Sequence, residues 1–226
     1  MKWDDVGYLL SKNKYNENSV IIETYTKNHG KRSGIIFGGT SKKIKNYLQL
    51  GNKLYINYKS KNENRLGYFQ IEIFKVYSPF YFENKKKLIC IISTMHLLKL
   101  LTADSQENRQ IFELIDNFYE ILNHDNWVVE YIFWELKLLS LLGFKIEFEK
   151  IIKTEILNEK KKYYVVSNKS KKYIPNFLID KSTANIDKKN LIIALKLIGD
   201  FIEKNVLVPN NINYPLTRTD FVNLFK

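Results

Sequence analysis

The residues best suited to bind a ligand in this chain are lysines and arginines of its first third, and phosphate is the group that they suit. Both side chains hold phosphate through charge and hydrogen bonds. Side chains at i and i+2 of an extended segment share a face, so Lys12 with Lys14, and Lys59 with Lys61, can line one groove. The predicted nucleic-acid-binding residues are Lys12, Lys14, Lys31, Arg32, Lys42, Lys43, Lys45, Lys59, Lys61 and Arg65.

Tyrosines are interleaved with these cations along the sequence. They are Tyr8, Tyr15, Tyr47, Tyr55, Tyr58 and Tyr68. Basic grooves with aromatic rings bind single-stranded nucleic acid, because bases stack on the rings with about 1–3 kcal/mol per base. We expect most of these tyrosines to fill a protein core and one or two to be exposed for stacking.

The positive charge is concentrated in the same region. The chain has 226 residues and a formal net charge of +12. Residues 1–78 hold 14 Lys and Arg against 6 Asp and Glu, a net charge of +8 on one third of the chain. An AT-rich coding bias would spread lysine more evenly, so the distribution favours a polyanionic partner such as nucleic acid.

Candidate catalytic groups are few. Gly38–Lys42 has the composition of a phosphate loop but lacks the G-x-x-x-x-G-K-[ST] spacing. Asp4 and Asp5 would point to opposite sides of an extended segment. Glu147 and Glu149 would share a face if extended, without a third carboxylate or histidine close in sequence. We interpret both pairs as solvated groups, and a metal-dependent nuclease remains an alternative.

The cysteine and histidine content predicts no metal and no cofactor. The single cysteine, Cys90, lies in the apolar run Leu88–Ile92 and is expected in the core. Structural zinc requires four close ligands, and the histidines are scattered at His29, His96 and His124. His29 lies in a turn and is interpreted as a turn residue rather than a phosphate ligand. The amino-terminal residues contain no apolar signal region, and the apolar runs are far shorter than the ~20 residues of a membrane span.

The elements that would position the basic residues are short strands. Strands are predicted at Val6–Leu10, Ser19–Thr26, Ser33–Phe37, Lys53–Tyr58 and Leu66–Val76. Alternation along the last of them predicts that Phe69, Ile71 and Ile73 face the core. Five strands in about 70 residues favour a closed OB-fold barrel, with an SH3-like barrel as the alternative.

Helical periodicity begins at Asn84 and defines a second predicted domain. Helices are predicted at Leu88–Leu101, Gln106–His124, Trp127–Leu142 and Asp187–Lys204, with a short last helix from Thr217. Asp104 with Glu107, Asp125 and Asp187 are the predicted caps. Trp127 and Trp134 share one helix face and are interpreted as core. We predict a β-barrel domain at 1–79 and an all-α domain at 80–226, with a polar, zinc-free insertion at about 147–180 in which only Tyr163–Val166 is strand-like.

Ordered motifs along the whole chain carry a family resemblance. They are Trp3-x-Asp5-x-Gly7-Tyr8-Leu9-Leu10-Ser11, Thr26-x-x-His29-Gly30-Lys31, Leu48-Gln49-x-Gly51-Asn52, Leu66-Gly67-x-Phe69-x-x-Glu72, Trp134-Glu135-Leu136-x-Leu138-Leu139-x-x-Leu142-Gly143-Phe144, the basic segment Tyr164–Lys172, and Pro215-x-x-Arg218. In this order they resemble the bacterial recombination mediators of the RecO family.

The resemblance implies an OB-fold followed by a helical domain, and a cytoplasmic, nucleoid-associated protein that is not an enzyme. It implies binding of single- and double-stranded DNA and annealing of complementary strands. It also implies partnership with RecR, with the acidic tail of the single-strand-binding protein SSB, and a functional link to RecA loading in the RecF pathway. A pure protein adaptor is a further alternative.

Two departures from the family pattern matter. Ile151 stands where many members carry a cysteine, so no zinc is expected. Several family arginines appear as lysines, which keep the charge but lose the bidentate fork. Since Lys31, Arg32, Lys42 and Lys43 flank one short strand, we predict that they meet at one end of the barrel. We also predict that they matter more for DNA than the run Lys160–Lys162.

Overall fold

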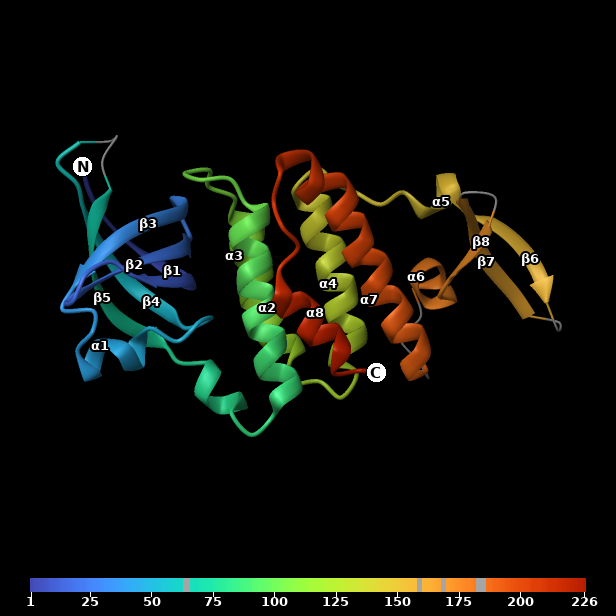
Figure 1. Cartoon of the computed structure of the whole chain (residues 1–226), viewed down its shortest axis with the longest axis horizontal. Coiled ribbons are helices and arrows are strands. Elements are labelled where there is room, and N and C mark those ends of the chain that lie inside the picture. The colour runs from blue at the N-terminus through green and yellow to red at the C-terminus, as the bar shows by residue number, and fades with distance from the viewer. Residues whose placement is uncertain (63–65, 158–159, 168–169, 182–185) are drawn as a thin grey trace. The chain divides into compact units, whose positions relative to one another are not determined.

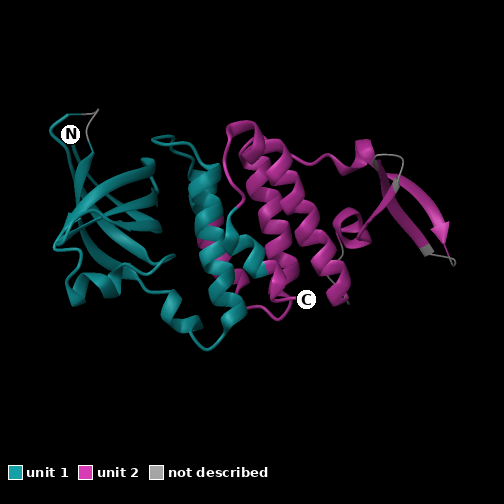
Figure 2. Ribbon diagram, viewed as in Figure 1, with its two compact units in different colours: residues 1–113, 215–221 teal, residues 114–214, 222–226 magenta. Residues whose placement is uncertain are grey.

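The computed structural model of the chain describes residues 1–62, 66–157, 160–167, 170–181 and 186–226. The chain forms two compact units, residues 1–113 with 215–221 and residues 114–214 with 222–226 (Figure 2). The domain division expected after residue 79 falls inside the short helix η1 (Ser78–Tyr81) and stays a prediction.

Five strands of the first unit close into a barrel (Figure 1). They are β1 (Lys2–Lys14), β2 (Ser19–Thr26), β3 (Gly30–Phe37), β4 (Lys53–Lys59) and β5 (Gly67–Lys75). Their order around the barrel is β1-β2-β3-β5-β4. All five predicted strands are present, and the bounds of β2 are those expected from its β-branched sequence.

Barrel closure depends on the length of β1. Its first part pairs antiparallel with β4, from Lys2 opposite Lys59 to Tyr8 opposite Lys53. Its second part pairs antiparallel with β2, and the register shifts between Leu9 and Ser11. Such an irregularity bends a strand and increases its twist, so one strand can serve both neighbours.

The last seam of the barrel is a short parallel pairing of β3 with β5, where Gly34 lies opposite Gly67. Both positions require glycine because an aromatic ring lies close to the backbone at each of them. A Cβ on Gly34 would lie 2.6 Å from the ring of Phe69, and a Cβ on Gly67 would lie 2.3 Å from the ring of Tyr58. The two rings fill the barrel interior, so the seam closes only where no side chain stands in their place.

The barrel interior confirms the alternation predicted for β5. Phe69 and Ile71 are buried in one cluster with residues of the other strands, and Ile73 packs against that cluster from a partly buried position. Each buried side chain of this size is stabilised by about 1.5–3 kcal/mol relative to exposure.

The first unit also contains helices. They are α1 (Lys42–Tyr47), η1, α2 (Lys85–Leu101), the start of α3 (Arg109–Ile121) and most of α8 (Leu216–Asn223). Helix α1 lies in the connection between β3 and β4, where no helix was predicted, and the side chain of Ser41 caps it. The predicted cap of α3 is wrong, because Asn108 Oδ1, rather than Asp104, accepts from a first-turn amide, that of Ile111 at 3.1 Å.

The second unit contains the remaining elements. They are most of α3, α4 (Trp127–Leu141), α5 (Phe148–Ile151), β6 (Lys153–Leu157), β7 (Lys160–Ser167), β8 (Ser170–Ile174), α6 (Asn176–Asp180), α7 (Lys188–Ile202), η2 (Glu203–Leu207) and η3 (Val208–Asn210). The interpretation of Trp127 and Trp134 as core is confirmed, since both are buried. Asp187 caps α7 through Asn190 N, whereas α4 begins after Asn126 without a side-chain cap, so the cap predicted at Asp125 is wrong.

The expectation of an all-α second domain is wrong. Strands β6, β7 and β8 form a three-stranded antiparallel sheet in the segment expected to be a polar insertion. Tyr163 of β7 is buried, and its hydroxyl donates to Asp180 Oδ1 at 2.8 Å at the end of α6. The strand predicted at Tyr163–Val166 lies within β7, and the sheet has one anchored face.

Candidate nucleic-acid interface

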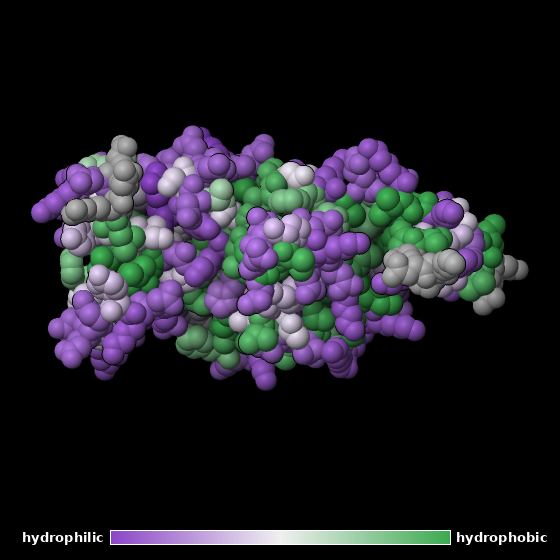
Figure 3. All heavy atoms as spheres, turned by 45° about the horizontal axis from the view of Figure 1, so that its top comes forward, coloured by the Kyte–Doolittle hydropathy of each residue, from purple (hydrophilic) through white to green (hydrophobic). Residues whose placement is uncertain are grey.

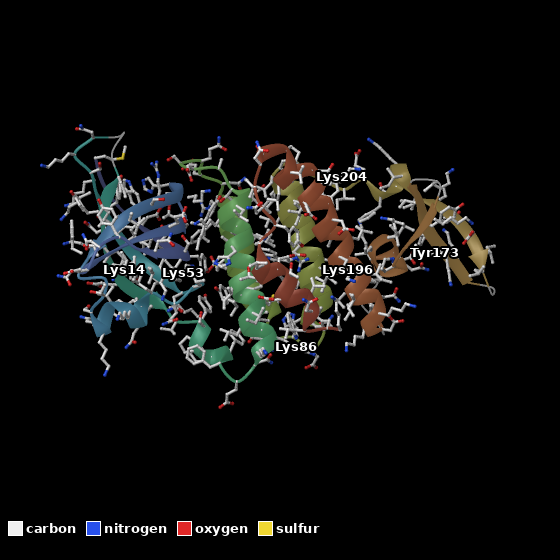
Figure 4. The ribbon with its side chains drawn as sticks, viewed as in Figure 1. Lys14, Lys53, Lys86, Tyr173, Lys196 and Lys204 are labelled. Atoms are coloured by element: carbon white, nitrogen blue, oxygen red, sulfur yellow. The ribbon has the colours of Figure 1, made fainter. Side chains whose placement is uncertain are left out.

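Three predicted lysines line one hollow of about 620 Å³ on the barrel, which we call the lysine hollow. Lys12 and Lys14 come from the end of β1, and Lys45 comes from α1; Figure 4 labels Lys14. The side chains of Lys12 and Lys14 share a strand face, as their spacing predicted. Helix α1 supplies the third cation because it crosses beside that strand end, where Gln49 and Leu48 complete the wall.

The ammonium of Lys12 is partly held by the protein. Its Nζ donates to the carbonyl oxygen of Leu48 at 2.5 Å, at the end of α1. Partial burial lowers the pKa of Lys12 from its usual 10.5, because desolvation disfavours the charged form. The hydrogen bond to Leu48 thereby fixes the Lys12 ammonium at the rim of the hollow, although Lys12, like Lys14 and Lys45, is an exposed residue.

A second hollow of about 400 Å³ lies on the other side of α1, and we call it the aromatic hollow. Phe37 at the end of β3 and Tyr68 of β5 stack there, with ring centroids 5.0 Å apart. Lys59 also lines it, and its Nζ donates to Gln70 Oε1 at 3.4 Å. Ile44 of α1 reaches this hollow while Lys45 reaches the other, so one helix separates a basic surface from an aromatic one.

Two further predicted cations stand at the start of α1. Lys42 and Lys43 follow the cap Ser41 and are exposed. Lys61 is exposed in the connection after β4, whereas Arg65 lies outside the described residues. The structure thus gathers most of the predicted set around α1 and the strand ends beside it.

Lys31 and Arg32 do not join this group, and the prediction that they meet Lys42 and Lys43 at one end of the barrel is wrong. They lie at the start of β3, whereas α1 follows its end, and an eight-residue strand spans about 23 Å. Lys31 is also engaged, with its Nζ donating to Lys99 O at 2.7 Å and lying 3.2 Å from Asp104. Arg32 Nε donates to the carbonyl of His29 at 3.1 Å.

The formal charge of the first third overstates the charge on its surface. Lys53 is 8% exposed, and its Nζ lies about 5 Å from the ring centroids of Tyr8, Phe74 and Phe112. Such cation–π contacts hold the ammonium inside an aromatic cage. A count of lysines along the sequence could not separate this enclosed cation from the exposed ones.

The interleaved tyrosines divide between core and surface, but the expectation that most fill the core and only one or two are exposed is wrong. Tyr8 and Tyr58 are buried, and Tyr47 is half-buried beside the core cluster. The remaining three are exposed: Tyr15 at 56%, Tyr55 at 50% and Tyr68 at 41%. Sequence reasoning missed Phe37, which is 64% exposed; the signal available was an aromatic residue at a strand end immediately before Gly38-Gly39.

The carboxylate pairs have structural partners. Asp5 Oδ2 accepts from Asn28 N at 2.8 Å and lies 2.9 Å from His29 Nδ1, while Asp4 accepts from Asn57. The ring of His29 stacks on Trp3, so His29 is a turn residue fixed in place.

The second carboxylate pair is also not a paired site. Glu149 is helical in α5, and residues two apart on a helix do not share a face, so the shared face expected for an extended Glu147 and Glu149 is absent. Within the described ranges no three His, Cys, Asp or Glu side chains gather as a group that could hold a metal ion.

Comparison with known protein families identifies the family of this chain. Residues 1–77 match the family model described as Recombination protein O N terminal, and residues 83–210 match that described as Recombination protein O C terminal. The chain belongs to the RecO family. RecO membership gives it a role in DNA repair and recombination.

Individual RecO relatives align over most or all of the chain. The DNA repair protein RecO of Wolbachia sp. subsp. Drosophila simulans (strain wRi) is 26% identical over 242 residues, which cover 99% of this chain and 100% of the relative. That of Bartonella tribocorum is 26% identical, covering 100% and 96%. That of Rickettsia canadensis is 31% identical, covering 75% and 69%. In the described part of the chain no helix has the length and apolar character needed to cross a membrane.

Proposed function

We propose that this RecO protein binds single- and double-stranded DNA on the α1 side of its barrel. The observation that carries the proposal is the lysine hollow, where cations of β1 and α1 converge next to the stacked pair Phe37 and Tyr68. We assign the closed five-stranded barrel to the OB-fold, a class that holds phosphates in a basic groove and stacks bases on aromatic rings.

The proposed contacts separate into two groups. The first group surrounds α1 and makes the main phosphate contacts: Lys12, Lys14, Lys42, Lys43, Lys45, Lys59 and Lys61. Lys31 and Arg32 contribute less, because their side chains are engaged at the other end of β3. Arg65 remains a proposed contact outside the described residues.

The proposed mechanism is electrostatic and makes or breaks no covalent bond. Lysines neutralise phosphates while base edges stay free to pair. When two strands bind at once, their mutual repulsion falls and complementary sequences anneal. The exposed rings of the aromatic hollow would hold unpaired bases apart from one another until a partner strand arrives.

The partners and setting proposed from the family are RecR, the SSB tail and, through them, RecA loading in the bacterial cytoplasm at the nucleoid. The region after residue 79 is the proposed site of protein docking. An acidic tail with an apolar end requires an apolar slot with a cation at its mouth.

A charge-reversal pair tests the barrel site. Lys12→Glu with Lys45→Glu should weaken DNA binding at least tenfold, about 1.4 kcal/mol. It should also lower the slope of log affinity against log salt by about 0.7 for each lost phosphate contact on single-stranded DNA. Lys196→Glu with Lys204→Glu is the matched control, since both lysines are exposed on the second unit (Figure 4).

Equal losses from the two pairs would contradict the barrel site. A salt-independent affinity would favour the adaptor alternative. Mg²⁺-dependent cleavage of single-stranded DNA by the purified protein would favour the nuclease alternative.

A further inference from the structure

The three-stranded sheet β6–β8 has one face that the proposed function does not use. Antiparallel register places Lys153 opposite Tyr164, and Tyr164 opposite Tyr173. Alternation adds Lys162 and Lys171 to the same side of the pleat. We call these five residues the open face.

The other side of the sheet is the anchored one. Tyr163 and Ile174, which lie opposite each other in the register, are 6% and 3% exposed. Because strand side chains alternate, burial of these two fixes the open face toward solvent. In Figure 3 the region of β6–β8, at the right of the view, shows hydrophobic and hydrophilic residues side by side.

Aromatic rings and cations are in direct contact on the open face. The rings of Tyr164 and Tyr173 meet edge to face with centroids 6.2 Å apart, and Tyr173 is 45% exposed. Lys171 Nζ lies 4.6 Å from the Tyr164 centroid, and Lys162 Nζ lies 5.8 Å from the Tyr173 centroid. A flat exposed ring bordered by ammonium groups is a surface on which a base stacks while its phosphates meet the cations.

A single carboxylate fixes this arrangement. Glu155 of β6 accepts from Lys171 Nζ and from Tyr173 Oη, each at 2.5 Å. The hydrogen bond from Lys171 is the first cause that lowers the pKa of Glu155, so the carboxylate stays ionised at neutral pH. Glu155 thereby holds the ring of Tyr173 in place and offsets one of the three cations, which leaves a net positive face.

We infer that the open face is a second binding site for single-stranded nucleic acid, separate from the barrel. Tyr173 stacks one base, Lys153 and Lys162 contact the flanking phosphates, and Glu155 positions the ring without touching the ligand. The exposed ring favours a nucleic acid over an acidic protein segment, since an acidic segment needs the cations alone. The inference does not depend on the barrel site, because none of its residues belongs to the barrel.

The test uses the full chain carrying Lys12→Glu and Lys45→Glu, which removes the proposed barrel contacts. A single-stranded oligonucleotide with one 2-aminopurine reports stacking by fluorescence quenching, and anisotropy reports affinity. In this background Lys153→Glu with Lys162→Glu should weaken the remaining binding at least fivefold. Tyr173→Leu should reduce the quenching while leaving circular dichroism unchanged.

The matched control reverses the same number of charges on the opposite side of the same sheet. Lys161→Glu with Lys172→Glu should change affinity less than twofold, since both are exposed but alternate away from the open face. Equal losses from both pairs, or quenching that is insensitive to Tyr173→Leu, would overturn the inference. So would displacement of the oligonucleotide by a poly-glutamate peptide whose own binding ignores Tyr173→Leu, since that points to a protein partner.

The outcomes separate this inference from the proposed function. Loss of binding through Lys12 and Lys45 alone supports the barrel site and rejects the open face. Loss through Lys153 and Lys162 alone supports the open face and rejects the barrel site.

Discussion

The barrel and the β6–β8 sheet carry the same residue types, lysine and tyrosine, in two different geometries. In the barrel, three cations line one hollow, and the stacked rings of Phe37 and Tyr68 line another with Lys59 as its one lysine. On the open face of the sheet, cations lie over the rings themselves. The separated arrangement suits a strand that must be held by its backbone while its bases pair, whereas the mixed one suits a single base held in place.

The two regions also differ in how they are supported. The barrel is a closed structure whose seam tolerates no added atom at Gly34 or Gly67. The sheet is open, and its exposed face is held by the contacts of Glu155. A substitution inside the barrel should therefore act through folding, and one on the sheet should act through ligand contacts alone.

The largest expected effect is on the barrel seam. Gly34→Ala places a Cβ 2.6 Å from the Phe69 ring, so either the ring or the β3–β5 pairing must move. We expect a loss of about 2–3 kcal/mol in the free energy of unfolding, typical of overpacking. Urea denaturation of the full chain measures it. Ser33→Ala, the neighbouring residue on β3, should change stability by less than about 0.5 kcal/mol; similar values for the two would show that the seam can relax.

The fold was largely predictable where the sequence pattern is long and regular. The β-branched run Ser19–Thr26 predicts β2 directly. The alternation of Phe69, Ile71 and Ile73 predicts which face of β5 points into the barrel. Helix α1 was missed because six residues are too few for a helical period to be visible. The strands β6 and β8 were missed because lysine lowers strand propensity, which was overridden here by pairing with β7.

The residue types of the site could be predicted, but which of these residues lie together in space could not. The spacing of Lys12 and Lys14 was enough to place them on one face, but their meeting with Lys45 depends on where α1 lies. The grouping of Lys31 with Lys42 failed because residues that flank a single strand lie at its opposite ends. Net charge also counted Lys53, whose aromatic cage is formed by residues distant in sequence.

The next effect compares the basic residues of α1 with those of β7. Lys42→Glu with Lys43→Glu should weaken DNA binding and annealing at least tenfold, about 1.4 kcal/mol. Lys160→Glu with Lys161→Glu should cost less than half of that free energy, because only position 160 of this pair shares the register side of the open face and Lys161 alternates away from it. Fluorescence anisotropy at one salt concentration compares both pairs. A larger loss for the β7 pair would move the main DNA path onto the second unit.

A smaller effect separates the two exposed aromatic groups of the barrel. Phe37→Ala removes one ring of the stacked pair in the aromatic hollow, and we expect single-stranded DNA binding to weaken about fivefold, or about 1 kcal/mol. Tyr55→Ala removes another exposed ring that contacts Phe74 instead, away from that hollow, and should change affinity less than twofold. Binding of duplex DNA should be unchanged in both, since paired bases are not available to stack. Equal losses for the two variants would show that the aromatic hollow is not where bases stack.

The smallest effect concerns the pH at which the lysine hollow loses charge. Burial lowers the pKa of Lys12 below 10.5, and phosphate binding favours its charged form, so its contribution is complete near neutral pH and declines as pH rises through the lowered pKa. Arginine remains charged throughout this range. As pH rises from neutral toward 10.5, the affinity of the unaltered protein for DNA should therefore fall more than that of Lys12→Arg. Lys14→Arg, on the same strand face, is the matched control. If Lys12→Arg and Lys14→Arg change the pH dependence alike, burial of the Lys12 ammonium does not set the charge of the hollow, and the difference between the two lysines lies in geometry alone.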